Sequence, residues 1–157
     1  EAIDVSNIFG DYAVGSLVAF EKGEPKKDAY RRYKIRTVTK IDDYAMIREV
    51  VSRRYKRILK EKDVGIPGIE LPDLILIDGG KGHLSTAVET LNTLHLKLSV
   101  IALAKEKEEI YIPQATQPLS LPKNSPALHL LQHIRDEAHR FALSYHKLLR
   151  KKTSLPS

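Results

Sequence analysis

The spacing of hydrophobic residues changes along the chain, and this change separates predicted strands from predicted helices. Four consecutive apolar residues at Leu74–Ile77 are typical of a strand that is buried on both faces. Asp78 follows at the end of this strand, and Gly79 and Gly80 predict a sharp turn. The remaining predicted strands are Glu1–Ser6, Tyr12–Glu21, Ala29–Val38 and Leu98–Ala104, with turns at Asn7–Asp11 and Lys22–Pro25.

Apolar residues recur every three or four positions in three other segments, which predicts three amphipathic helices. The first is expected from the N-cap residue Asp42 to about Lys60, and the second over Leu84–Leu94. Ser125 and Pro126 open the last helix as N-cap and first helical residue. Three segments connect the predicted elements: the loop Lys62–Glu70, the polar hairpin arm Lys105–Ile112 and the irregular segment Pro113–Lys123.

The predicted order is three strands, helix, strand, helix, strand, helix. This order predicts an α/β protein with a ribonuclease H-like mixed sheet, in which three antiparallel strands precede parallel strands and helices flank the sheet. In that topology the first strand lies beside the fourth at the centre of the sheet. We therefore expect Asp4, on the first strand, to lie next to Asp78.

Length and composition indicate one globular domain. A chain of 157 residues with 42% hydrophobic residues can bury one adequate core. No apolar run approaches the roughly 20 residues of a membrane-spanning helix, so no membrane contact is expected. Cysteine is absent, which fits a reducing cytoplasm. The domain is expected over residues 1–152, with 153–157 as the start of a linker in a longer protein.

Positive charge is concentrated at a few places in the sequence. Lys and Arg number 26 against 20 acidic residues, which gives a net charge of +6. Clusters at Arg31–Arg32 and Arg53–Arg57 are interleaved with tyrosines, as in surfaces that contact phosphates and stack on bases. A solvated basic face explains the same pattern equally well.

Asp4 and Asp78 are the clearest candidates for chemistry. Two carboxylates about 4 Å apart repel by about 4 kcal/mol at an effective dielectric constant near 20, and a divalent cation removes that cost. Oxygen ligands favour Mg²⁺ or Mn²⁺, which can promote phosphodiester hydrolysis. The last helix offers a third group in Asp136, Glu137 or His139. Each residue also has a simpler interpretation, with Asp78 as a turn former and His139 as a surface histidine.

Five motifs of the chain resemble the C-terminal endonuclease domain of the UvrC family. They are IDVSNIFG, YRRYKI, IDDYAMIREVVSRRYKR, PDLILIDGGKGHLSTA and SPALHLLQHIRDEAHRFALSYH. The resemblance runs from Asp4 to about Lys152. It implies a ribonuclease H-like domain that makes the incision 5′ to a DNA lesion with a metal-dependent Asp, Asp, His set. It also implies damaged double-stranded DNA as substrate, and the UvrB helicase subunit as a partner of other parts of the full-length protein.

Carried over by motif, the resemblance places the family's catalytic set on Asp4, Asp78 and His139, with Asp4 and Asp78 on the metal and His139 as ligand or as the group that polarises the water. A further functional acidic position falls on Asp43, which equally resembles a helix N-terminal residue. The expected DNA contacts are Arg31, Arg32, Arg53, Arg54, Lys81, Arg135 and Arg140.

Two other functions share this fold. A catalytically silent docking module for nucleic acid or protein would need the basic surface but no metal. A general nuclease for RNA or RNA–DNA hybrids with the same fold is the third possibility. The filled Asp, Asp, His positions favour the nuclease over the docking module, and the motif of the last helix favours the DNA repair family.

Overall fold

The computed structural model describes residues 1–8, 12–36 and 42–154. Its main sheet contains the strands β1 (Ala2–Ile8), β2 (Tyr12–Val18), β5 (Arg31–Lys34), β6 (Ile75–Asp78), β7 (Val100–Leu103) and β8 (Ile110–Tyr111). The helices are α1 (Asp43–Asp63), α2 (Lys81–Thr93) and α3 (Pro126–Ser154), with a short 3-10 helix at Lys27–Ala29. A separate hairpin joins β3 (Phe20–Glu21) to β4 (Glu24–Pro25).

The six strands of the main sheet lie in the order β5-β2-β1-β6-β7-β8. β1 runs antiparallel to β2 and parallel to β6, with Ala2 opposite Leu76 and Ile3 opposite Ile77. β5 is antiparallel to β2, and β7 is parallel to β6. The predicted ribonuclease H-like arrangement is therefore confirmed, including the central position of the first and fourth strands.

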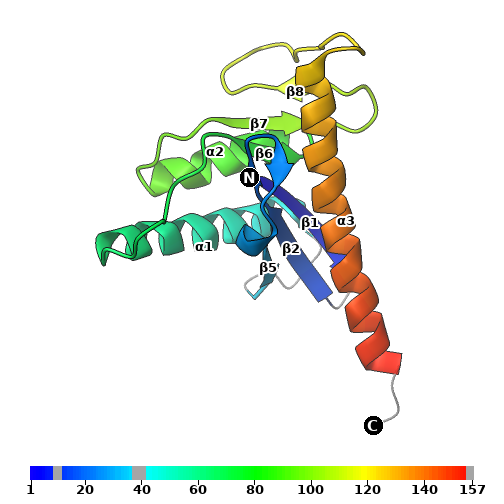
Figure 1. Ribbon diagram of the computed structural model, residues 1–157. Coiled ribbons are helices and arrows are strands. Elements are labelled where there is room, and N and C mark those ends of the chain that lie inside the picture. The colour runs from blue at the N-terminus through cyan, green and yellow to red at the C-terminus, as the bar shows by residue number, and fades with distance from the viewer. Residues whose placement is uncertain (9–11, 37–41, 155–157) are drawn as a thin grey trace.

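The helices cover both faces of the sheet (Figure 1), so the molecule has three layers. On one face, Ile3 of β1 and Ile77 of β6 pack with α1 and α2 around the buried Tyr55. On the other face, Ala2 and Leu76 pack against Ala138 of α3. Alternate residues of β6 thus enter opposite cores, which is why the sequence of this strand is continuously apolar.

Several strand boundaries differ from the sequence-based prediction. The predicted strand Tyr12–Glu21 is interrupted at Ala19, because Phe20 and Glu21 leave the main sheet and pair with β4. Lys22 and Gly23 form the hairpin turn with positive φ angles of 54° and 81°. The strand predicted over Ala29–Val38 is shorter in the structure, where β5 ends at Lys34, and residues 37 and 38 lie outside the described residues.

The helices are longer than predicted. α1 continues to Asp63. α2 begins at Lys81 rather than Leu84, because Gly80 is its N-cap residue. α3 reaches Ser154, so helical backbone extends into the segment expected to be a linker. The predicted turn at Asn7–Asp11 begins later than expected, because β1 continues to Ile8, and residues 9–11 are not among those described.

Candidate active site

A cleft of about 400 Å³ lies at the carboxyl end of β6, beside the middle of β1 and α3. Its charged and titratable lining residues are Asp4, Asp43, Asp78, His83, Lys105 and His139. The structure therefore brings together all four residues that were predicted as catalytic. It adds Lys105 and His83, which the sequence analysis did not assign to the site.

The pleat of the sheet directs both aspartates toward α3. Side chains two positions apart on a strand point to the same face of the sheet. Asp4 therefore shares the α3 face with Ala2 on β1, and Asp78 shares it with Leu76 on β6. Ala138 of α3 packs on that same face, and the next residue is His139. The His139 Nδ1 atom consequently lies 3.4 Å from the Asp4 Oδ2 atom, while about half of the His139 side chain stays exposed.

Both aspartates are largely buried and incompletely paired. Their side chains are only 8% and 13% exposed for Asp4 and Asp78. The Asp4 Oδ2 and Asp78 Oδ1 atoms have no hydrogen-bond partner in the described part of the chain. Burial, followed by the negative charge of Asp78, raises the pKa of Asp4 to about 6, and His139 partly offsets this.

Among the described residues, Lys105 is the one Lys or Arg of the cleft lining, set against the carboxylates of Asp4, Asp43 and Asp78. This excess of negative charge fits a divalent cation. Carboxylate oxygens with an imidazole nitrogen nearby are a donor set that suits Mg²⁺ or Mn²⁺. Among residues 1–8, 12–36 and 42–154, however, no group of three or more His, Asp or Glu side chains is arranged to hold a metal ion. Mg²⁺ sites commonly use one or two carboxylates and complete their coordination with water and substrate phosphate. The unpartnered oxygens of Asp4 and Asp78 fit that pattern, and His139 lies beside Asp4.

Asp43 and His83 form a second pair in the lining of the cleft. Asp43 is the first residue of α1, and its Oδ2 atom lies 3.7 Å from the His83 Nε2 atom. The His83 Nδ1 atom accepts a hydrogen bond of 3.1 Å from the Gly80 backbone N–H, so the ring proton belongs on Nε2 and points to Asp43. The pair thereby links α1 to the turn that follows Asp78.

Gly79 has a φ angle of 150°, and an added Cβ atom would overlap the His83 ring. Glycine is required here because the backbone of the turn and the ring of His83 share one confined space. The sequence signal for His83 was its place in the first helical turn after two glycines, where a side chain can cap the helix.

Asp136 and Glu137, the other candidates for the third group, do not line the cleft. Asp136 pairs with Arg135 at 3.4 Å, and Glu137 accepts hydrogen bonds from Tyr30 and Arg140. The contacts with Arg135 and Arg140 lie within α3, whereas the bond from Tyr30 joins the helix to the segment before β5. His139 is the one of the three candidates that reaches Asp4.

Two of the predicted DNA contacts are engaged in ion pairs with little exposed surface. The Arg54 Nη2 atom lies 2.6 Å from the Glu1 Oε2 atom, and the Arg54 side chain is only 13% exposed. Arg135 pairs with Glu108 at 2.7 Å and is 14% exposed. Both side chains connect distant parts of the chain, which indicates a structural contribution for each.

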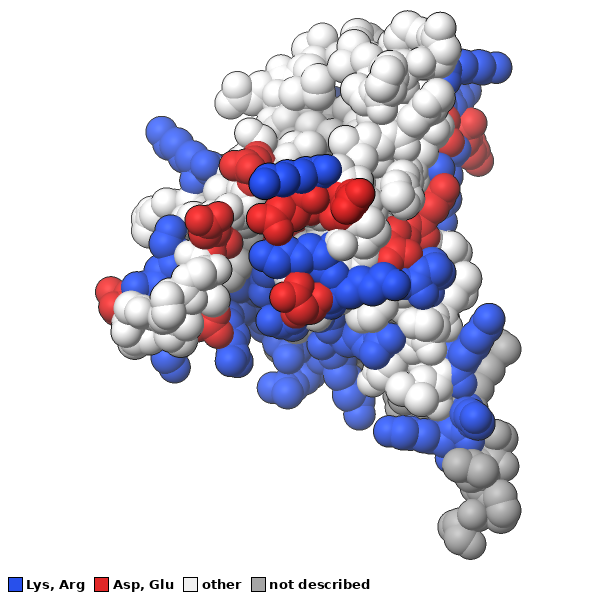
Figure 2. All heavy atoms as spheres, in the orientation of Figure 1, with Lys and Arg blue, Asp and Glu red and all other residues white. Residues whose placement is uncertain are grey.

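The other predicted arginines lie nearer the surface, away from the cleft lining. The Arg32 guanidinium stacks 4.2 Å from the ring centroid of Phe141, and Arg53 pairs with Glu49 at 3.0 Å. Arg31 donates to two backbone carbonyl oxygens, and Arg140 pairs with Glu137. Figure 2 shows Lys and Arg gathered over the lower part of one face, around α1 and the lower part of α3, whereas the surface over β8 is largely uncharged.

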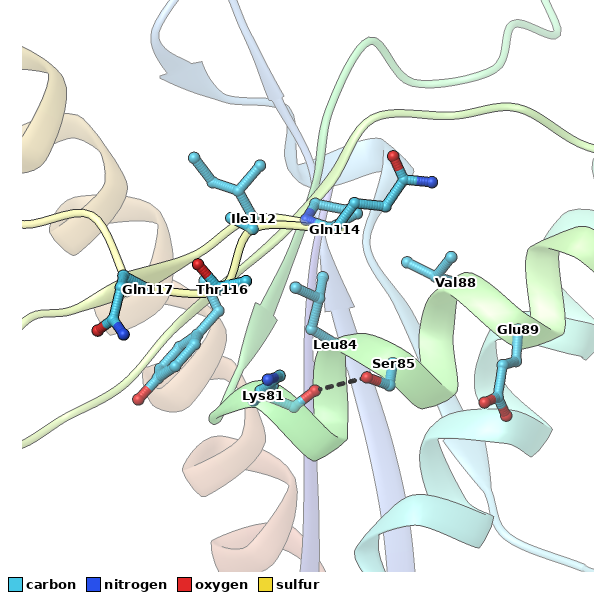
Figure 3. A pocket seen from close by; sticks show the side chains of 12 residues that line it. Lys81, Leu84, Ser85, Val88, Glu89, Ile112, Gln114, Thr116 and Gln117 are labelled. Atoms are coloured by element: carbon cyan, nitrogen blue, oxygen red, sulfur yellow. Dashed lines mark hydrogen bonds between the residues drawn. The ribbon is translucent and has the colours of Figure 1, made fainter.

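Lys81 lies outside the cleft, in a second pocket of about 440 Å³. As Figure 3 shows, it sits on the first turn of α2, facing the segment that carries Ile112 and Gln117. The apolar side chains of Leu84, Val88 and Ile112 make up much of the lining. The structure therefore separates Lys81 from Asp78, although only two glycines lie between them in the sequence.

The sheet order and the paired aspartates at its centre define a ribonuclease H-like nuclease domain. A family model described as the UvrC RNase H endonuclease domain matches residues 1–143, and the chain belongs to that family. The helices of the described residues include none that is long and apolar enough to cross a membrane.

Relatives of this chain are named UvrABC system protein C. The chain is 55% identical over its full length to the protein from Dehalococcoides mccartyi strain BAV1, covering 26% of that protein. Identity is 52% to the protein from Methanococcus maripaludis, over 97% of this chain and 28% of the relative. The chain thus spans about a quarter of the length of these relatives. The crystal structure of human ENDOV matches with a TM-score of 0.43 and 14% identity, over 80% of this chain and 49% of that one.

Proposed function

We propose that this chain is a metal-dependent DNA endonuclease domain that makes the incision 5′ to a lesion in nucleotide excision repair. The observation that carries the proposal is the pair of buried aspartates on neighbouring strands, each with an unpartnered oxygen. Family membership supports the endonuclease class, and the names of the relatives support the repair pathway. The docking-module alternative gives no reason to bury two adjacent carboxylates.

Asp4 and Asp78 are the residues that would hold Mg²⁺ or Mn²⁺. When bound, such an ion supplies the positive charge that stabilises the phosphodiester as negative charge develops on it. The oxygen of water forms a new bond to phosphorus while one P–O ester bond breaks, which leaves a phosphate monoester and an alcohol.

His139 is placed to manage the proton of the attacking water. Its Nδ1 atom faces the Asp4 carboxylate at 3.4 Å, which favours the tautomer with the proton on Nδ1. Nε2 then keeps a free lone pair on a side chain that is half exposed to the cleft. In this proposal Nε2 accepts the proton from water, and Asp4 stabilises the resulting imidazolium. Alternatively, the Nε2 atom of His139 would coordinate the cation directly.

The proposed substrate is damaged double-stranded DNA. The candidates for phosphate contact are four arginines near the surface. Arg31 and Arg32 lie on β5, Arg53 lies on α1 and Arg140 lies on α3. UvrB is the proposed partner of the full-length protein, through parts outside this chain, and the cytoplasm is the proposed compartment.

The test is the incision of a lesion-containing duplex by the full-length protein carrying Asp78→Asn. This change keeps the size of the side chain and removes its charge, so we expect 5′ incision to be abolished with the fold intact. Asp73→Asn is the matched control, because Asp73 is exposed and lies outside the cleft lining. Retained 5′ cutting by Asp78→Asn would refute the proposal, and preferential cutting of an RNA–DNA hybrid by the wild type would indicate the other nuclease class.

A further inference from the structure

Lys105 is a cation of the cleft to which the family resemblance assigns no role. Of the Lys and Arg residues that the structure describes, it alone belongs to the cleft lining. None of the seven predicted DNA-binding cations lines this cleft. Among the described Lys and Arg side chains, Lys105 is therefore the one placed to contact a phosphate bound in the cleft.

The backbone of Lys105 is held at a defined place beside Asp78. Leu103, the last residue of β7, is opposite Asp78 in the sheet, and its carbonyl oxygen accepts a hydrogen bond of 3.2 Å from the Gly79 N–H. The Ala104 N–H donates to the Glu109 carbonyl oxygen at 3.0 Å, which closes the arm that follows. Lys105 therefore leaves the sheet directly at the cleft.

The side chain of Lys105 is attracted to the site but only loosely attached. Its Nζ atom lies 3.8 Å from the Asp78 Oδ2 atom, beyond hydrogen-bond distance, and 64% of the side chain is exposed. An ion pair between an exposed lysine and a carboxylate at this distance contributes little stability, so the lysine can leave the carboxylate easily. Its four-carbon stem can therefore redirect the ammonium group toward another anion in the cleft.

We propose that Lys105 is a further catalytic residue, which balances the charge of Asp78 in the metal-free protein and contacts a non-bridging oxygen of the scissile phosphate during hydrolysis. The inference rests on the proposed function. It has two consequences that a surface lysine would not have: the ammonium group competes with a divalent cation for Asp78, and it stabilises charge that develops on the phosphate.

The first experiment measures Mn²⁺ affinity by electron paramagnetic resonance for the wild type, Lys105→Met, Lys105→Arg and Lys107→Met. Loss of one positive charge next to Asp78 should tighten Mn²⁺ binding by about three- to tenfold in Lys105→Met. Lys105→Arg keeps the charge and should stay near the wild type. Lys107→Met is the matched control, because Lys107 is exposed on the same arm but does not line the cleft.

The second experiment measures 5′ incision by the full-length variants at saturating Mn²⁺. We expect the rate constant of Lys105→Met to fall by about 100-fold, with DNA affinity changed less than about threefold, and Lys105→Arg to recover part of the rate. Unchanged or weaker Mn²⁺ binding in Lys105→Met, or an unchanged incision rate, would overturn the role of Lys105. A wild-type protein that neither binds Mn²⁺ nor cuts DNA would instead refute the proposed function itself.

Discussion

Replacing Asp4 by asparagine should stabilise the metal-free protein, which is an unusual outcome for a change in a buried residue. The ionised Asp4 is disfavoured in the folded state by burial and by the charge of Asp78, so its pKa rises from 3.8 to about 6. That difference corresponds to about 3 kcal/mol of folding free energy at neutral pH, at about 1.4 kcal/mol per pKa unit. Asparagine removes the charge but keeps a polar group without a full set of partners, so a gain of about 2 kcal/mol is expected.

The pH dependence follows from the direction of the shift. Because the folded-state pKa is the higher one, ionisation of Asp4 costs no stability below pH 3.8 and its full cost is reached above about pH 6. The advantage of Asp4→Asn should therefore be about 2 kcal/mol at pH 7.5 and less than about 1 kcal/mol at pH 4.5.

Thermal unfolding in a chelating buffer measures this difference. For a chain of this length, about 2 kcal/mol corresponds to a rise in Tm of about 4–8 °C at pH 7.5. Asp63→Asn, at the exposed end of α1, is the control for loss of one negative charge. Added Mn²⁺ should stabilise the wild type but not Asp4→Asn. An Asp4→Asn protein that is no more stable than the wild type at pH 7.5, or whose advantage does not change with pH, would refute the electrostatic reasoning.

Two further predictions concern the metal and the buried arginine. Since Asp4 must be ionised to bind a cation, Mn²⁺ affinity should fall about tenfold between pH 7 and pH 5, and calorimetry that finds a pH-independent affinity would contradict the role of Asp4. Arg54→Met leaves the Glu1 carboxylate buried without its ion pair, so urea unfolding should show a loss of about 2–4 kcal/mol. If this variant is as stable as the wild type but binds DNA more weakly, Arg54 is a DNA contact after all.

The central part of the fold could be predicted from the sequence, because its signals are local and strong. The apolar run before Asp78 required a strand buried on both faces, and the order of elements placed β1 beside it. Period-two alternation then directs Asp4 and Asp78 to one face of the sheet. His139 was located by its motif, since helical periodicity alone placed it only on a polar stripe.

The remaining features depend on contacts between distant parts of the chain, which leave no local pattern. The end of β2 at Val18 is decided by the separate β3–β4 hairpin, although the residues that follow are good strand formers. Lys105 reaches Asp78 only through the register of β7 on β6. Arg54 belongs to a tyrosine-rich basic cluster in the sequence, yet in the structure it pairs with Glu1, which is distant in the sequence. Basic clusters therefore predicted charge but not its accessibility.

The most direct test of the account is a Mn²⁺ titration of this chain, followed by electron paramagnetic resonance, beside Asp4→Asn, Asp78→Asn and the control Asp73→Asn. We predict saturable binding in the wild type and in Asp73→Asn, and its loss in both cleft variants, because the two aspartates form one metal site. Binding that neither cleft variant changes would show that Asp4 and Asp78 do not hold the metal, and would contradict the proposed active site.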